Sequence, residues 1–149
     1  MSEAIRFVAN RNAPADAEVL GVPVFSGRRL PAGAGAELDL EFLGRRNFEG
    51  KAGQTHALLA DDGTTLVALG LGEPEALTID GLRRAAAALV GAAGTARTAA
   101  TTLLAAVPAS LDARAAAQAI AEGAALASYR FTTYKSDRDR PALESLTVV

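Results

Sequence analysis

The chain has 149 residues, of which 50% are hydrophobic and 21% are charged, a composition typical of one globular domain with its own core. Its formal net charge of −2 argues against a general nucleic-acid-binding protein, which would be strongly basic. The absence of cysteine excludes disulfides and thiolate metal sites. With one histidine, His56, a histidine-based metal site or a Ser-His-Asp triad is nearly excluded.

The hydropathy pattern predicts no membrane segment. No apolar run approaches the roughly 18 residues that a membrane span needs. The first ten residues, MSEAIRFVAN, alternate like a strand and lack the basic region and apolar run of a signal peptide.

The first third of the chain predicts two strands and a loop. Residues 4–9 alternate apolar and polar side chains, as a strand does. Residues 18–25 predict a second strand, in which Pro23 indicates an edge position or a bulge. The glycine-, proline- and alanine-rich residues 26–39 predict a surface loop. Residues 38–47 fit either a short helix or a strand.

The middle of the chain predicts a β-hairpin followed by a loop. Residues 55–60 and 65–69 are apolar runs separated by Asp62-Gly63, and glycine supplies the positive φ that hairpin turns demand. The second run is nearly all apolar, as expected of a strand buried on both faces. Residues 69–78, LGLGEPEALT, predict a loop.

Two helices are predicted in the second half of the chain. Thr78 or Asp80 caps the first, which ends near Gly91 or Gly94. Ser110 or Asp112 caps the second, which is rich in alanine and extends to about Tyr129. The residues expected to face the core are Leu82, Ala85, Ala86 and Leu89 on the first helix, and Ala116, Ala119, Ile120, Gly123 and Ala127 on the second.

Further strands complete the expected fold. Residues 101–108, TTLLAAVP, predict a buried strand that Pro108 closes. Residues 135–142 predict a charged linker, and residues 143–149 predict a final strand. Strands that alternate with helices indicate an α/β layered domain with a mixed sheet.

The segment 45–59, RRNFEGKAGQTHALL, suggests a phosphate-binding loop because Gly50 and Gly53 flank Lys51. A P-loop, however, places its glycines before the lysine and leads into a helix, whereas a strand is expected here. We therefore favour a tight bend, with Lys51 solvated or paired with a carboxylate.

A second ligand candidate is the G-x-G of residues 69–75, which leaves a buried strand and leads to a helix. The motif lacks the third glycine of a dinucleotide fingerprint, and Glu73 and Glu75 would repel a phosphate. A simple strand-to-helix turn is favoured there.

The remaining polar candidates have structural interpretations. His56 lacks an evident partner for acid–base catalysis. Asp61 and Asp62 are adjacent and serve the hairpin turn. The aromatic and basic residues 129–137 could stack on single-stranded nucleic acid, but a helix end folded onto the core is favoured. The arginine pairs, Arg28-Arg29 and Arg45-Arg46, are interpreted as solvated surface charge.

Several segments, in this order, resemble the N-terminal domain of the leucyl aminopeptidase (cytosol aminopeptidase) family. That domain shows F-x-G-K-x-G-[EQ], a G-x-G, an L-R-x-A helix and E-G-x-x-L-x-x-Y-x-F-x-x-Y-K-S. The residues that match are Phe48, Gly50, Lys51, Gly53, Gln54, Gly70, Gly72, Leu82, Arg83, Ala85, Glu122, Gly123, Leu126, Tyr129, Phe131, Tyr134, Lys135 and Ser136. The agreement covers residues 40–149; the first forty residues match only as a generic strand pair.

The resemblance implies a macro-domain-like three-layer α/β fold over residues 1–149, with a mixed β-sheet flanked by helices. In the family, a C-terminal catalytic domain follows. It binds two divalent metals, usually zinc, manganese or magnesium, and carries N-T-D-A-E-G-R and K-G-x-x-x-D-[ST]-G-G motifs that this sequence lacks. We therefore expect a truncated or detached domain, without catalytic, cofactor-binding or metal-binding residues of its own.

The resemblance also implies a cytoplasmic enzyme that assembles as a hexamer, in which this domain aids assembly, shapes access to the active sites or tunes specificity. Its expected partners are its own catalytic domain and further copies of the chain, with neither nucleic acid nor membrane. Two alternatives remain: a free-standing macro-like module that binds ADP-ribose or another nucleotide through Gly70 to Glu73, and a nucleic-acid-binding domain, which the acidic net charge disfavours.

Overall fold

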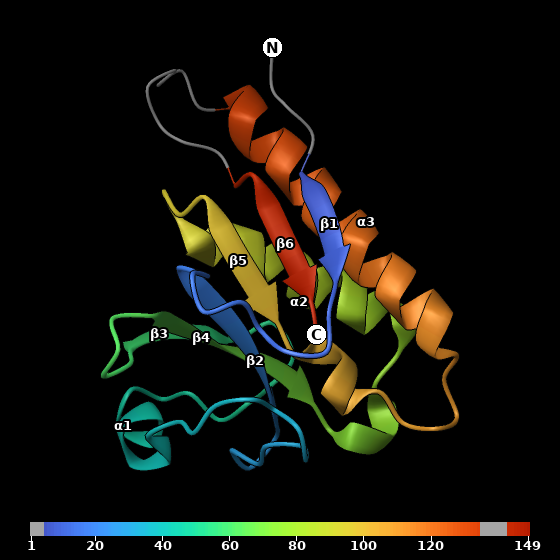
Figure 1. Ribbon diagram of the computed structural model, residues 1–149. Coiled ribbons are helices and arrows are strands. Elements are labelled where there is room, and N and C mark those ends of the chain that lie inside the picture. Colours follow the sequence, from blue (N-terminus) through green and yellow to red (C-terminus); the bar gives the residue numbers. More distant parts are fainter. Residues whose placement is uncertain (1–4, 135–142) are drawn as a thin grey trace.

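A six-stranded sheet forms the centre of the computed structural model, which describes residues 5–134 and 143–149 (Figure 1). Its strand order is β1-β6-β5-β2-β4-β3, and every neighbouring pair is parallel except the antiparallel pair of β3 and β4. The elements are β1 (Arg6–Ala9), β2 (Val19–Phe25), α1 (Leu40–Arg45), β3 (Thr55–Leu59), β4 (Thr65–Gly72), the 3-10 turn η1 (Pro74–Ala76), α2 (Ile79–Ala93), β5 (Thr98–Thr101), the 3-10 turn η2 (Leu103–Ala106), α3 (Ala113–Tyr134) and β6 (Ser145–Val148). The predicted α/β fold, with a mixed sheet flanked by helices, is confirmed.

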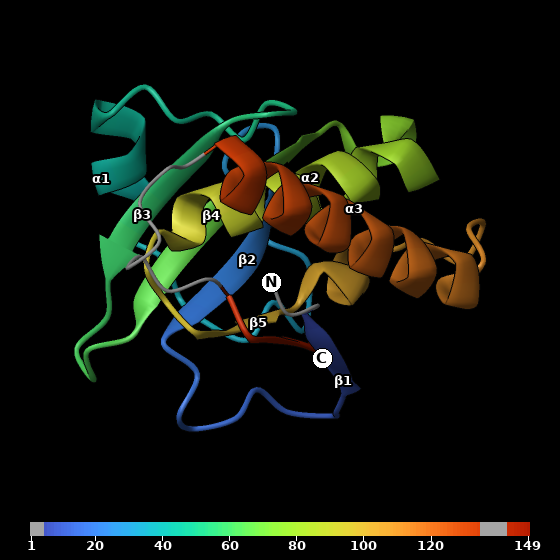
Figure 2. The ribbon, with the colours of Figure 1, turned by 90° about the horizontal axis from the view of Figure 1, so that it is seen from above.

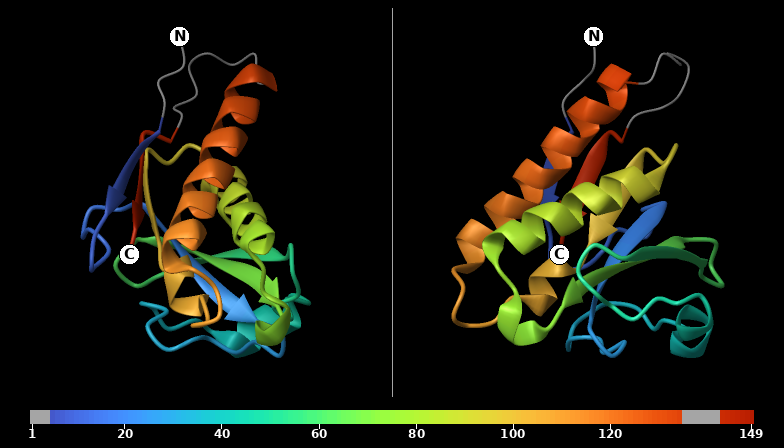
Figure 3. Two further views of the ribbon diagram at one scale, coloured as in Figure 1. Left: turned by 90° about the vertical axis from the view of Figure 1, so that its right-hand side faces the viewer. Right: turned by 180° about the vertical axis from the view of Figure 1, so that it is seen from behind.

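Helices cover the sheet on both faces. Helices α2 and α3 lie side by side on one face (Figure 2), while α1 and α2 lie on opposite sides of the β3–β4 hairpin (Figure 3). Because successive strand residues point to opposite faces, Val67 of β4 packs with Leu82 in the core under α2, whereas Ala68 packs with Leu43 and Phe48 under α1.

The predicted edge position of Pro23 is wrong, because β2 lies between β5 and β4 in the sheet. Pairing with β5 ends at Gly21, whose carbonyl accepts the N–H of Thr102. Pro23 is two residues further on, so its nitrogen faces the same side, where β5 has already given way to η2. A proline costs no ladder hydrogen bond at that place. The other predicted position, a bulge, agrees with the structure, because the register between β2 and β4 shifts just after Pro23, between Val24 and Phe25.

The prediction of a strand over residues 101–108 is also wrong. The strand β5 ends at Thr101, and Leu103–Ala106 form the turn η2. The Thr101 hydroxyl donates to the carbonyl of Gly21 and accepts the N–H of Leu103. The Thr101 side chain thereby provides hydrogen-bond partners for backbone groups at the end of β5, where the chain leaves the sheet and Leu103–Ala106 form η2.

Hydrogen bonds show which of the two predicted capping residues begins each helix. The Thr78 hydroxyl accepts the N–H of Gly81 at the start of α2, and the Asp112 carboxylate accepts the N–H of Arg114 at the start of α3. Helix α2 is followed by Gly94 with φ +62°, as expected of a helix end. The ambiguous residues 38–47 form the short helix α1, which the Asp39 side chain caps through the N–H of Phe42.

Three further predictions are confirmed. The hairpin of β3 and β4 turns at Gly63, with φ +92°, and β6 forms the last strand. The predicted core stripes of both helices are buried, although Ala127 is only partly so. Helix α3, however, extends past Tyr129 to Tyr134, and the predicted linker over residues 135–142 lies outside the described residues. No helix in residues 5–134 and 143–149 is long and apolar enough to cross a membrane.

Candidate functional site

The two glycine motifs singled out in the sequence form one structure. The glycine–lysine loop, residues 49–54, lies against the end of β4. The Gly72 N–H donates to the carbonyl of Gly50 at 2.8 Å, and the Gly70 N–H donates to the carbonyl of Gln54 at 2.8 Å. The Gly53 N–H donates in turn to the carbonyl of Gly70 at 3.3 Å. The loop therefore continues the pairing of the hairpin beyond β3.

Two glycines are required by this close approach. Gly50 has φ +86°, and a Cβ at this position would overlap the backbone carbonyl of Phe25. A Cβ on Gly70 would overlap the carbonyl oxygen of Lys51. Both positions thus bring one backbone segment directly onto another, which only glycine permits.

The Gln54 side chain closes the glycine–lysine loop. Its Oε1 accepts the N–H groups of Glu49 and Lys51 at 2.9 Å and 3.0 Å, and its Nε2 donates to the carbonyl of Asn47 at 3.2 Å. A phosphate cradle needs backbone N–H groups that point to an open space. Here those N–H groups are bound within the loop, which supports the interpretation as a structural bend. The Lys51 side chain is exposed.

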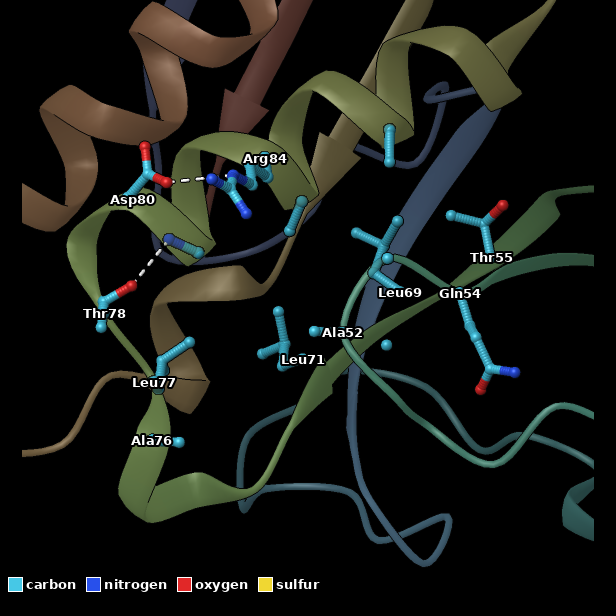
Figure 4. Close-up of a pocket in the computed structure, with 15 residues that line it drawn as sticks. Ala52, Gln54, Thr55, Leu69, Leu71, Ala76, Leu77, Thr78, Asp80 and Arg84 are labelled. Carbon is cyan, nitrogen blue, oxygen red and sulfur yellow. Dashed lines mark hydrogen bonds and ion pairs between the residues drawn. The ribbon is translucent and has the colours of Figure 1, made fainter.

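A cavity of about 260 Å³ lies between this loop and the start of α2 (Figure 4). Leu71, Leu77 and Ala85 contribute apolar surface, while Thr78, Asp80 and Arg84 stand at its rim. This size suits a small organic group, and apolar walls with a few polar groups are typical of ligand pockets.

Two polar groups at the rim, the Asp80 carboxylate and the Thr78 hydroxyl, already have partners in α2. The Asp80 carboxylate accepts from Arg84 Nε and from Arg83 Nη1, both at 3.0 Å. The Thr78 hydroxyl caps the N–H of Gly81 (Figure 4). A ligand that used the Asp80 carboxylate or the Thr78 hydroxyl would compete with these contacts.

His56 is a structural residue rather than a base. Its ring lies 5.5 Å from the Phe42 ring, tilted by 59°, and the Arg46 guanidinium stands 5.3 Å from the centre of the same Phe42 ring. These contacts hold α1 against β3. None of them supplies the nucleophile or the orienting carboxylate that general-base catalysis needs.

Asp62 serves the hairpin turn, as predicted. Its Oδ1 accepts the N–H of Thr64 at 2.9 Å. This backbone hydrogen bond, followed by one from the Thr64 side chain, lowers the pKa of the Asp62 carboxyl below its ordinary value. Asp61 and Asp62 are both exposed.

The interpretation of Arg28 as solvated charge is wrong. Its guanidinium Nη1 contacts both carboxylate oxygens of Glu49 at 2.9 Å, and its side chain is only 33% exposed. The pair ties the end of β2 to the glycine–lysine loop. Arg29 lies 3.6 Å from Glu73 and is largely exposed. Sequence offered no signal for the Arg28–Glu49 pair, because 21 residues separate its members.

The described part of the chain holds no group of three or more histidine, aspartate or glutamate side chains placed to share a metal ion. The donor set of a two-metal hydrolase is therefore not offered by residues 5–134 and 143–149. The side chains of Tyr129, Phe131 and Tyr134, predicted to fold back on the core, lie outside the described residues, as do Lys135 and Asp137.

Comparison with known proteins identifies relatives for most of the chain. The model of the cytosol aminopeptidase family, N-terminal domain, matches residues 22–138. The probable cytosol aminopeptidase of Acaryochloris marina is 38% identical over 103 residues, 66% of this chain and 20% of the relative. The corresponding protein of Nostoc punctiforme is 37% identical over 112 residues, 72% of this chain and 22% of the relative.

Solved structures agree with these sequence relatives. The bottromycin maturation enzyme BotP matches 89% of this chain and 27% of its own, with a TM-score of 0.70 and 33% identity. A mutant of tomato leucine aminopeptidase matches 99% of this chain and 33% of its own, with a TM-score of 0.75 and 25% identity. The chain thus spans about a fifth of the length of the curated relatives and up to a third of the solved chains.

Proposed function

The chain belongs to the cytosol aminopeptidase family as its N-terminal domain, and from this we propose that it is the non-catalytic part of a leucyl-aminopeptidase-type metallopeptidase. The observation that carries the proposal is the family match over residues 22–138. In this proposal the complete enzyme releases N-terminal amino acids from peptides in the cytoplasm, and residues 1–149 form its first domain.

Catalysis is assigned to a C-terminal domain of that enzyme. Two-metal hydrolysis needs a cluster of ligands around the ions and groups that polarise the carbonyl and activate water. The described residues contain no such cluster, so no step of the reaction is assigned to them. Two divalent ions, zinc or manganese, would be held by the further domain. A solved complex of BotP with Mn supports the choice of metal.

The proposed role of this domain is assembly of a homo-hexamer or control of access to the active sites. The internal pairing of its polar groups supports a scaffold: the glycine–lysine loop is closed by its own hydrogen bonds, and the rim of the cavity by its own ion pairs. In this proposal, a domain whose polar groups are bonded internally presents a rigid surface to the catalytic domain and to other subunits.

The test uses the protein encoded by the complete reading frame that contains these residues. The purified protein is assayed on leucine p-nitroanilide and on longer peptides with manganese, with and without residues 1–149, and its mass is measured by sedimentation. We expect the deletion to change the oligomer or the preference between short and long peptides. Unchanged mass and unchanged kcat/KM for both substrates would refute the assigned role.

Nucleotide binding through Gly70 to Glu73 remains the alternative. It is weakened by the backbone pairing there, because Gly70 and Gly72 already donate their N–H groups to the glycine–lysine loop. Glu73 is also exposed at the same turn and carries negative charge. Calorimetry with ADP-ribose separates the two proposals: binding heat would favour the alternative.

A further inference from the structure

One edge of the described part of the molecule is built from segments that contain no charged residue. Two segments form it, residues 30–36 (LPAGAGA) and 102–111 (TLLAAVPASL), which we call the uncharged edge. Charged residues make up 21% of the chain, whereas these two segments contain none, and thirteen of their seventeen residues are at least partly exposed. Depletion of charged residues is one mark of the centre of a protein interface.

The two segments are in direct contact. The Thr102 hydroxyl donates to the carbonyl of Ala34. A Cβ on Gly35 would lie 2.9 Å from the methyl carbon of Thr102, and a Cβ on Gly33 would lie 3.6 Å from Cβ of Ala105. The uncharged edge is therefore one continuous surface rather than two separate loops.

Much of this surface faces solvent in the 149-residue chain. Ala32, Gly33, Gly35, Ala109 and Ser110 are exposed. Apolar side chains between them are partly buried, and Leu104, Val107 and Leu111 also pack against the core.

The uncharged edge lies where the parallel strands end. Strands β2, β5 and β6 run toward it, as the arrows in Figure 1 show. The N–H of Val149 donates to the carbonyl of Thr101 at 3.0 Å, one residue before the uncharged edge begins. Any polypeptide that follows Val149 in a longer chain therefore leaves beside this surface.

We infer that the uncharged edge is the surface on which the catalytic domain of the same polypeptide docks. The inference rests on the proposed function. Its support is the length of the curated relatives, about five times the matched part, together with the position of Val149. A domain joined directly beside the surface has a high effective concentration there, so even modest apolar contact holds it in place.

Hydrogen exchange measured by mass spectrometry tests this inference. The complete protein is compared with its double variant Ala32→Glu/Ala109→Glu, which places two charges on exposed positions of the uncharged edge. The control variant is Ala125→Glu, because Ala125 is exposed on α3. The same substitutions in the 149-residue chain should leave its melting temperature nearly unchanged.

In the complete protein, we expect the amides of the exposed residues Gly33, Gly35 and Ser110 to exchange at least about tenfold more slowly than in the double variant. The control variant should retain this protection. Equal exchange in the complete protein and the double variant would overturn the inference. A reading frame that encodes no further domain would overturn the proposed function as well, whereas an active enzyme with an unprotected edge would contradict only this inference.

Discussion

At the scale of single residues, Gly50 is the most constrained position of the glycine–lysine loop. Its φ of +86° costs any other L-residue roughly 1–2 kcal/mol. A methyl group would in addition overlap the backbone carbonyl of Phe25, which forces a shift worth about 1–3 kcal/mol more. We therefore expect Gly50→Ala to lower the free energy of unfolding by about 3 kcal/mol, measured by urea denaturation.

Gly53 provides the matched control for this prediction. It lies in the same loop with φ +89°, but a Cβ there would meet nothing within 4 Å. Gly53→Ala should therefore cost only the conformational part, about 1–2 kcal/mol. Equal losses for the two variants would show that the close approach of the loop to Phe25 is not required.

At the scale of elements, the contact between α2 and α3 depends on Gly123. A Cβ at this position would overlap the carbonyl oxygen of Arg83, so the helices can approach this closely only with glycine. Despite the better helix propensity of alanine, we expect Gly123→Ala to destabilise the protein by about 1–3 kcal/mol. Thermal unfolding monitored by circular dichroism measures this loss.

Gly91 tests the same substitution without the neighbouring helix. It is exposed in α2, and a Cβ there would meet nothing within 4 Å. Gly91→Ala should stabilise the protein by up to about 1 kcal/mol, because only the propensity term acts. The two variants thus have opposite expected signs, and a gain in stability from Gly123→Ala would contradict the close packing of α2 on α3.

Elements with a strong local signal were predictable from the sequence. The β3–β4 hairpin follows from Asp62-Gly63 between apolar runs, and α2 follows from its capping threonine and its stripe of buried residues. The strand expected over residues 101–108 failed because an apolar run does not reveal its period. The hydrogen bond from the Thr101 hydroxyl to the carbonyl of Gly21, at the end of β5, connects residues 80 positions apart.

At the scale of the whole molecule, sequence motifs indicated the family but not the reason for the motifs. Gly50, Gly70 and Gln54 suggested a ligand loop or a bend, and only the fold shows that they let the glycine–lysine loop close on itself and pack against the ends of β2 and β4. The Arg28–Glu49 pair and the edge formed by residues 30–36 and 102–111 were not predictable, because each joins segments that are distant in sequence.

The central proposal is that the complete protein hydrolyses peptides with residues outside these 149. The most direct measurement is the turnover of leucine p-nitroanilide by the purified 149-residue chain with millimolar manganese, beside the complete protein under the same conditions. We predict no turnover by the 149-residue chain above that of buffer with metal, and saturable turnover by the complete protein. Saturable turnover that rises in proportion to the concentration of the 149-residue chain would contradict the proposal.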